Sequence, residues 1–251
     1  MNRVTSLAAA LGLLAGGASV APAFADDAPA KGGCPVTYNQ LVQALKPSVA
    51  ASGGPTNGGL DFNMWAAAVN RDGFVCQVAF SGKDRNAQWP GSRLIAAQKA
   101  YAANAFSLDS FALSTANLYA PTLPGGSLWG LQFSNLLSTP TAYQGNPSAY
   151  GTANDPLDGN KVGGLIVFGG GLGLYDGKGI VGGLGVSGDT SCADHNVAWR
   201  VRKALGLDKV PSGVAKGTDG ILYSKNPTGF EHPLCGNSEQ SVAKKIGATP
   251  K

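Results

Sequence analysis

The sequence lacks several signals that would place it in a common functional class. Charged residues make up only 14% of the chain, the formal net charge is +4, and the cationic side chains are scattered rather than gathered in a stripe. Nucleic-acid binding needs a concentrated basic surface, so this class is excluded. Beyond the N-terminal leader no apolar run approaches the roughly 20 residues of a membrane-spanning helix, so we expect no membrane span in the mature chain.

The motifs of common catalytic and metal sites are also missing. No Gly-x-Ser-x-Gly elbow occurs, which argues against a hydrolytic triad. No two cysteines form a close C-x-x-C pair, which argues against a thioredoxin-like redox motif or a zinc ribbon. The glycine-rich residues 169–173 lack the Gly-Lys-Ser/Thr ending of a phosphate-binding loop and lie in a hairpin region. They indicate strands that bend or approach closely, not a nucleotide site.

The N-terminus has the three parts of a signal peptide. Arg3 supplies a positive charge, residues 7–20 form a short apolar run, and Ala23, Phe24 and Ala25 fit the small-x-small pattern that signal peptidase recognises. We therefore expect cleavage after Ala25 and a periplasmic or secreted mature protein.

The four cysteines all lie in the mature part, where an oxidising compartment lets thiols pair. Four cysteines allow three connectivities. We favour Cys34 with Cys76 and Cys192 with Cys235, because this pairing ties each terminal extension to the nearer half of the core. Each bridge would contribute about 2–4 kcal/mol of stability.

The hydrophobic pattern predicts a single α+β domain. Two short apolar runs around Asp72-Gly73 and two more around residues 176–179 read as β-hairpins, and helical stripes cover residues 37–49, 92–106 and 192–205. A further strand is expected over residues 163–168, and short helices over residues 114–119 and 128–135 of a proline-rich insert. We expect an N-terminal extension over residues 26–58, the domain over 59–210 and a loop-rich tail over 211–251 packed on it. The helices then flank an antiparallel sheet of about five strands.

The densest polar cluster is residues 187–195, where a strand leads into a helix. Asp189, Thr190 or Ser191 can cap the free backbone N–H groups, and capping explains most of the cluster. The functional alternative makes His195 a haem or metal ligand, or an acid/base group. If Cys192 pairs with Cys235, the only other histidine, His232, comes close to His195. Asp194 would complete a metal site, although the spacing matches no zinc motif.

Aromatic and cationic side chains offer further contacts for a cofactor. An apolar site could be lined by Met64, Trp65, Trp89, Trp129 and Phe133, although such residues more often belong to the core. Arg93 and Lys99 on the long helix could pair with carboxylates such as haem propionates, the alternative being a solvated helix face.

Two stretches resemble the signatures of a known family. Residues 90–100, PGSRLIAAQKA, and residues 182–188, GGLGVSG, followed by Asp194, Val197 and Ala198, look like those of the GlcG/HbpS-like haem-binding proteins. The module is also similar to the C-terminal domain of PduO-type proteins. The resemblance covers roughly residues 59–207. The insert over residues 107–159 is longer than the usual connection in that family.

The resemblance implies an antiparallel sheet of about five strands with profilin-like layering, assembly into homo-oligomers, and haem or related tetrapyrrole binding. Lys99 and Asp194 match signature positions, and His195 follows one. Exported members are similar to extracellular haem sensors that act beside a membrane-bound signalling partner.

These observations predict an exported haem-binding module without turnover, a haem or iron sensor or scavenger. His195 is the favoured iron ligand, and the other expected cofactor-binding residues are Asp194, Lys99, Arg93 and His232. One alternative is a ligand-free structural or interaction protein, which the low charge and apolar insert support. Another is a small-molecule enzyme that uses Asp194 and His195 as an acid/base pair. It ranks last, because no nucleophile or second carboxylate completes a mechanism.

Overall fold

The computed structural model describes residues 33–250, so the expected signal peptide lies outside the described residues. At its centre is one antiparallel sheet with the order β2-β1-β4-β3. The strands are β1 Trp65–Asn70, β2 Val75–Phe80, β3 Gly171–Tyr175 and β4 Ile180–Ser187. Both predicted hairpins are present, and β1 pairs with β4 to join them into one sheet.

The first hairpin closes where its sequence predicts. The turn after β1 has Gly73 at a φ of 84°, a conformation that glycine adopts without steric cost. The side chain of Asn70 accepts a hydrogen bond from the backbone N–H of Phe74, at 3.0 Å, which fixes the turn.

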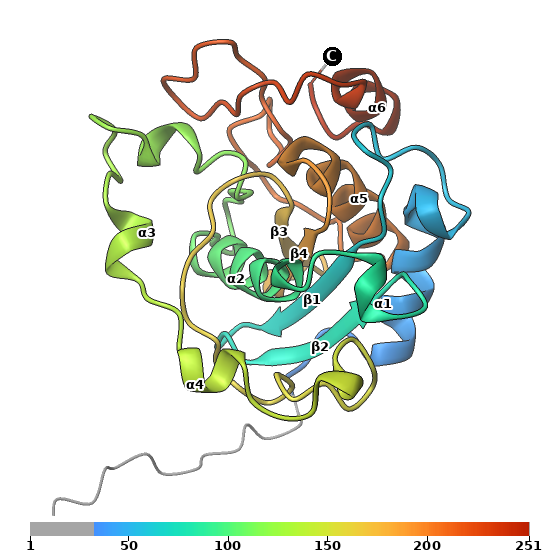
Figure 1. Ribbon diagram of the computed structural model, residues 1–251. Coiled ribbons are helices and arrows are strands. Elements are labelled where there is room, and N and C mark those ends of the chain that lie inside the picture. Colours follow the sequence, from blue (N-terminus) through green and yellow to red (C-terminus); the bar gives the residue numbers. More distant parts are fainter. Residues whose placement is uncertain (1–32, 251) are drawn as a thin grey trace, which may run out of the picture.

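The sheet is covered on both faces, because its side chains alternate. Trp65, Ala67 and Val69 of β1 pack with the helix α2, Gly91–Ala105. Ala66 and Ala68 face the opposite cluster, which includes residues of α1, Tyr38–Leu45, and α5, Ser191–Ala204. In Figure 1, α2 lies in front of the sheet. The predicted α+β class is confirmed, with helices on both sides of an antiparallel sheet.

Glycines on β4 allow α2 to approach the sheet closely. A Cβ on Gly183 would lie 2.2 Å from the carbonyl oxygen of Ala100, and one on Gly185 would lie 1.9 Å from that of Ala96. No larger residue fits between this helix and this strand. The glycines noted in the sequence therefore serve packing.

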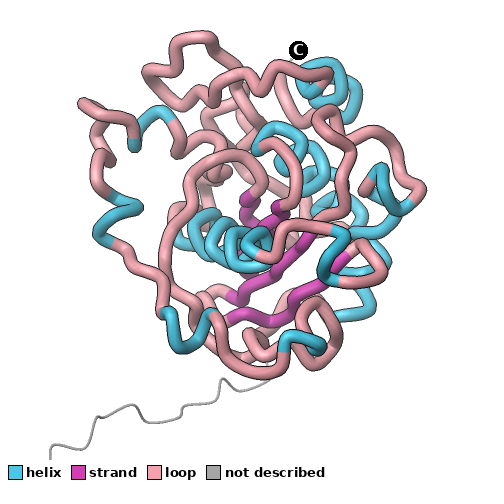
Figure 2. The backbone as a smooth tube through the Cα atoms, in the orientation of Figure 1, coloured by secondary structure: helices cyan, strands magenta, loops and turns pink. Residues whose placement is uncertain are grey.

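Much of the remaining chain is loop, as Figure 2 shows. The insert holds only two short helices, α3 Leu131–Ser134 and α4 Thr139–Ala142. Single 3₁₀ turns lie at Lys46–Ser48, Ala50–Ser52, Arg85–Ala87, Ala120–Thr122 and Pro147–Ala149. The tail ends in a helix, α6 Glu239–Ile246, which packs beside α5. Within residues 33–250 no helix is long and apolar enough to cross a bilayer.

Two expected elements are absent from the structure, and one helix is present that was not expected. Residues 163–168 make only an isolated bridge at Gly163 and form no strand, so the sheet has four strands instead of about five. Leu165 and Val167 are buried in a cluster with Ala102 and Leu118, so this run is apolar because it is a buried loop and not because it is a strand. Residues 114–119 form turns and no helix, and α6 was not predicted.

The favoured disulfide connectivity is confirmed. Cys34 is bonded to Cys76 on β2, and Cys192 on α5 is bonded to Cys235 in the tail. The first bridge attaches the N-terminal extension to the sheet, and the second attaches the tail to the start of α5.

Candidate functional site

The N-terminal end of α5 holds the predicted polar cluster. Thr190 caps the helix by accepting a hydrogen bond from the backbone N–H of Ala193, at 3.3 Å. Asp189 accepts hydrogen bonds from the backbone N–H groups of Leu60, at 2.8 Å, and Thr190, at 2.6 Å. Capping therefore accounts for Thr190, and hydrogen bonds to loop backbone account for Asp189, which leaves Asp194 and His195 to explain.

Asp194 forms a buried ion pair with Lys99 of α2. Lys99 Nζ lies 2.7 Å from Asp194 Oδ2 and donates to the carbonyl oxygen of Val186, at 3.1 Å. The other carboxylate oxygen accepts the N–H of Asp189, at 2.9 Å. Burial raises the pKa of Asp194 to about 6 and lowers the pKa of Lys99. The two signature residues thus satisfy each other and hold α2 to α5.

Arg93 is part of a separate buried pair. Its guanidinium donates two hydrogen bonds to the carboxylate of Asp155, Nε to Oδ2 at 2.9 Å and Nη2 to Oδ1, and stacks on the ring of Tyr150, 3.7 Å from its centroid. Arg93 is only 2% exposed and Lys99 is 0% exposed. The expectation that these cations meet haem propionates does not fit this structure, because each is enclosed with its own carboxylate.

His195 is fully buried, and within residues 33–250 neither of its ring nitrogens has a hydrogen-bond partner. Its ring stacks with that of Trp199, with centroids 6.1 Å apart. Burial holds the pKa of His195 well below its ordinary value, with smaller contributions from Arg202, His232 and Lys99. The imidazole is therefore neutral at pH 7, the form that binds metals.

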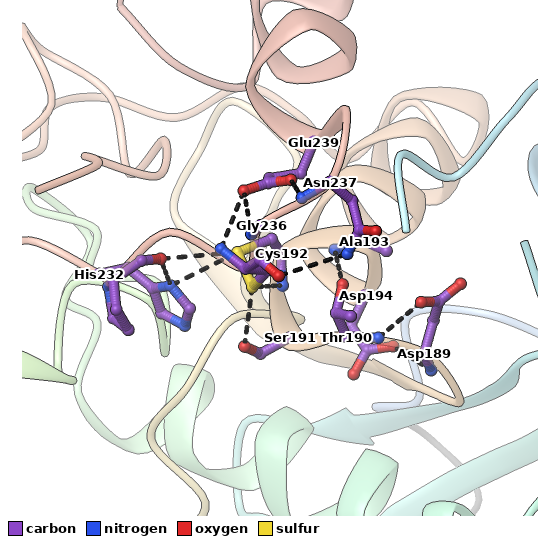
Figure 3. Close-up of a disulfide and its surroundings, with 12 residues drawn as sticks. Asp189, Thr190, Ser191, Cys192, Ala193, Asp194, His232, Gly236, Asn237 and Glu239 are labelled. Carbon is purple, nitrogen blue, oxygen red and sulfur yellow. Dashed lines mark hydrogen bonds between the residues drawn. A yellow bond between two sulfur atoms is a disulfide. The ribbon is translucent and has the colours of Figure 1, made fainter. Parts of the chain in front are cut away.

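His232 lies beside the second disulfide, as Figure 3 shows. Its Nδ1 is 2.7 Å from the carbonyl oxygen of Pro233 and 3.7 Å from Cys192 Sγ. Its ring packs against that of Tyr119, with centroids 5.1 Å apart. Burial lowers the pKa of His232 to about 4. Cys192 and His195 lie three residues apart on α5, so His232 packs at the same end of this helix as His195.

An apolar cavity of about 170 Å³ lies next to this region. Two of its lining residues lie near the buried histidines. Tyr119 packs on His232, and Phe168 immediately precedes Gly169, where an added Cβ would lie 3.2 Å from the Cβ of His195. The lining comprises Tyr119, Thr122, Leu123, Pro124, Trp129, Gly130, Gln132, Phe133, Val167 and Phe168. Tyr119 and Phe168 were missed in the sequence, since only the tertiary structure brings them beside α5.

The other aromatic candidates are distributed differently. Trp129 and Phe133 line the cavity edge to face, with centroids 5.7 Å apart, whereas Met64 and Trp65 are buried in the core. Trp89 packs edge-on against Phe62 elsewhere. A larger open groove of about 690 Å³ is lined by polar and charged residues such as Lys46, Lys83 and Arg85. Neither histidine lines this groove.

The structure therefore brings together His195, His232, Asp194 and Lys99, and leaves Arg93 outside the group. The ion pair is self-contained, so the chemistry open to this site is that of neutral imidazoles beside an aromatic, apolar cavity. Such a set suits coordination of a metal carried by a flat apolar ligand.

Comparison with known proteins supplies a family. Residues 59–202 match the family model described as "Haem degrading protein HbpS-like". No significant match is found among curated proteins. Among solved structures, the chain is similar to Klebsiella pneumoniae protein ORFY, with 20% identity, a TM-score of 0.45 and coverage of 68% of this chain and 90% of that one.

Two further solved structures are similar to a comparable extent. One is a complex of PduOC with haem, with 20% identity, a TM-score of 0.44 and coverage of 66% of this chain and 89% of that one. The other is HbpS, with 18% identity, a TM-score of 0.39 and coverage of 68% and 90%.

Proposed function

Because the chain belongs to the family of haem-degrading, HbpS-like proteins, we propose that it binds haem, with His195 as the iron ligand and the cavity beside Phe168 as the contact for the macrocycle. The observation that carries this proposal is the buried imidazole of His195, whose two nitrogens have no partner among residues 33–250. Leaving a buried polar group unpaired costs about 1–3 kcal/mol. Coordination of iron by one nitrogen would offset part of that cost.

The donor chemistry fits haem iron. A nitrogen ligates iron through its lone pair, so the imidazole must be neutral, as burial keeps it here. His232 is the only other histidine, and its Nδ1 is already directed at the carbonyl oxygen of Pro233. His195 is therefore the histidine with two ring nitrogens free of hydrogen bonds among residues 33–250, whereas His232 has one.

The aromatic and apolar lining of the cavity suits a tetrapyrrole macrocycle, but the cavity is too small to enclose one. A cavity of about 170 Å³ is below the roughly 300–1,000 Å³ typical of sites for drug-sized ligands. Much of a tetrapyrrole would therefore lie outside it, against Trp129, which is 55% exposed, and Phe133, which is 70% exposed. Since His195 is fully buried and does not line the cavity, binding requires the side chains between His195 and the cavity to move.

The proposal includes haem binding without turnover, as in a haem or iron sensor or scavenger. Asp194 is the carboxylate next to His195 in the sequence, and its ion pair with Lys99 keeps it from acting as an acid or base on a bound ligand. The family description names haem degradation, so binding must be distinguished from degradation. The absorption spectrum of the haem complex is followed over time in the presence of a reductant and oxygen. A stable spectrum supports binding alone, and conversion to an open-chain tetrapyrrole spectrum contradicts it.

Export and self-association complete the proposal. All four cysteines are paired, which suits an oxidising compartment, and a mature chain beginning at Asp26 is the expected product. The insert exposes large apolar side chains at Phe133, Leu136 and Tyr143, and such surfaces commonly form interfaces. We therefore propose a homo-oligomer beside a membrane-bound signalling partner, testable by light scattering and by the N-terminal mass of exported protein.

The direct test is titration of the oxidised protein with haemin, followed by absorption. We expect a shifted Soret band with one haem per chain, lost in His195→Ala and retained in His232→Ala. The two variants are matched, because each removes a buried imidazole close to the same cavity. Absence of a Soret shift in the wild type contradicts haem binding, and loss only in His232→Ala contradicts the assignment to His195.

A further inference from the structure

We propose that the Cys192–Cys235 disulfide is the oxidised form of a zinc site, in which the two thiolates and the imidazole of His232 bind Zn²⁺ once the bond is reduced. The proposal does not depend on haem binding, which concerns the oxidised protein. It rests on the placement of one ligand atom from each residue, since the two sulfurs and a ring nitrogen all lie within 4.8 Å of one another.

The distances suit a tetrahedral ion. Zinc binds sulfur at about 2.3 Å and nitrogen at about 2.0 Å, so a sulfur and a nitrogen on one zinc ion lie roughly 3.6 Å apart. Cys192 Sγ and His232 Nδ1 are already 3.7 Å apart, and Figure 3 shows the imidazole beside the disulfide. Binding at Nδ1 replaces its hydrogen bond to the carbonyl oxygen of Pro233 and moves the ring proton to Nε2. Three protein ligands leave a fourth position for water, and the partly buried Cys235 lies on the side from which solvent would reach it.

The ligands are held by contacts other than the disulfide. The carboxylate of Glu239 accepts hydrogen bonds from the backbone N–H groups of Cys235, Gly236 and Asn237, at 2.8, 3.2 and 2.8 Å. The backbone N–H of His232 donates to the carbonyl oxygen of Leu222, at 2.7 Å. Cys192 belongs to α5. Reduction would therefore leave all three residues close to their present positions.

The environment also favours thiolates. Cys235 Sγ accepts the backbone N–H of Cys192, at 3.3 Å, in the first turn of α5. N–H groups and the positive end of a helix dipole at this position stabilise a negative sulfur. The thiolate is the form that binds metals.

The chemistry balances with a dithiol as the reductant. The dithiol gives two electrons and two protons to the S–S bond, which breaks into two thiols, and the dithiol itself becomes a disulfide. Zn²⁺ then displaces the two thiol protons. Loss of zinc and oxidation of the thiolates restore the disulfide.

The test uses the full mature chain, reduced with a phosphine and then alkylated with iodoacetamide, with and without Zn²⁺, and each cysteine is quantified by mass spectrometry. We expect Zn²⁺ to protect Cys192 and Cys235 but not Cys34 and Cys76. The second pair is an internal control, because no metal-ligand cluster in the described part of the chain includes it. Equal alkylation of all four cysteines in the presence of Zn²⁺ overturns the proposal, and so does the equal alkylation that results if the reduced chain unfolds.

Spectroscopy with Co²⁺ in place of zinc identifies the ligands. The reduced wild type and a reduced Cys34→Ser, Cys76→Ser variant should show thiolate charge-transfer bands and tetrahedral d–d bands at one Co²⁺ per chain. The oxidised wild type should show neither. In reduced His232→Ala the d–d bands should shift and the affinity should fall by at least tenfold. An unchanged spectrum and affinity in His232→Ala would remove His232 from the site, and absence of bands in the reduced wild type would refute the site itself.

Discussion

Lys99→Met should make the stability of this protein depend on pH in a way that the wild type does not. Methionine keeps most of the buried volume but removes the charge and hydrogen bond that Lys99 supplies to Asp194, both of which lower the pKa of that carboxyl. In the variant the pKa therefore rises above its value of about 6 in the wild type, and Asp194 stays protonated in the folded state. The unfolded chain ionises it at its ordinary value of 3.8.

The magnitude follows from proton linkage. A group that is protonated when folded and ionised when unfolded removes about 1.4 kcal/mol of stability for each pH unit of increase. At pH 6 the wild-type carboxyl is about half ionised in the folded state, and above about pH 7 it is ionised in both states and adds almost no such slope. The difference in unfolding free energy between wild type and Lys99→Met should therefore widen by up to about 2.3 kcal/mol from pH 6 to pH 8, because the wild type itself loses about 0.4 kcal/mol over this range.

The assay is urea unfolding of the oxidised proteins at pH 6, 7 and 8, followed by tryptophan fluorescence and circular dichroism. A variant with both Lys99→Met and Asp194→Asn should lack the extra loss of stability that Lys99→Met shows between pH 6 and pH 8, since no carboxyl remains to titrate. Lys209→Met is a matched exposed control, because Lys209 is 64% exposed and 3.8 Å from Asp208, and its effect should stay below about 1 kcal/mol. A gap for Lys99→Met that is the same at pH 6 and pH 8 would refute the reasoning.

Three further predictions follow from packing, burial and the cavity. Gly185→Ala should destabilise the fold by about 3 kcal/mol or more, because its Cβ would lie 1.9 Å from the carbonyl oxygen of Ala96. The control is Gly91→Ala, whose Cβ meets nothing within 4 Å and which should be tolerated. Thermal unfolding of both variants checks this prediction. In the folded protein the imidazole of His232 stays neutral down to about pH 4, whereas in the unfolded chain it is protonated near its ordinary pKa of 6.5. The free energy of unfolding should therefore fall by up to about 3 kcal/mol as the pH decreases from 6.5 to 4. His232→Gln should lack that part of the acid loss in urea unfolding, and an identical loss would contradict the burial argument. Phe133→Ser should weaken haemin binding about tenfold, as expected for losing one apolar contact of about 1.4 kcal/mol. Leu136→Ser should leave the affinity unchanged, because Leu136 is 79% exposed and lies outside the cavity lining. Equal haemin affinities of the two variants would place haem elsewhere.

The sequence was sufficient for the elements whose signals are local. The Asp72-Gly73 turn between two apolar runs marked the first hairpin, and helical periodicity marked α2 and α5. Residues 163–168 misled because a short apolar run has the same composition in a strand and in a buried loop, and here it packs against α2 and Leu118. Helix α6 was missed because its apolar stripe is only Val242, Ala243 and Ile246 within a polar segment.

The site was harder to predict, because its partners are distant in the chain. Arg93 and Lys99 look like free cations in the sequence, and only the fold reveals that Asp155 and Asp194, 62 and 95 residues away, enclose them. The disulfide pairing was predictable from its topology, and it places His232 beside Cys192 at the start of α5. Tyr119 and Phe168, which line the cavity, have no local signal that would mark them.

Resonance Raman spectroscopy of the ferrous haem complex tests the central claim most directly, because the iron–histidine stretching band reports the ligand itself. The band should be present in the wild type, should shift when the histidines carry ¹⁵N, should persist in His232→Ala and should vanish in His195→Ala. A wild-type complex with no isotope-sensitive iron–histidine band, or a band that survives in His195→Ala, would contradict the assignment of His195 as the iron ligand.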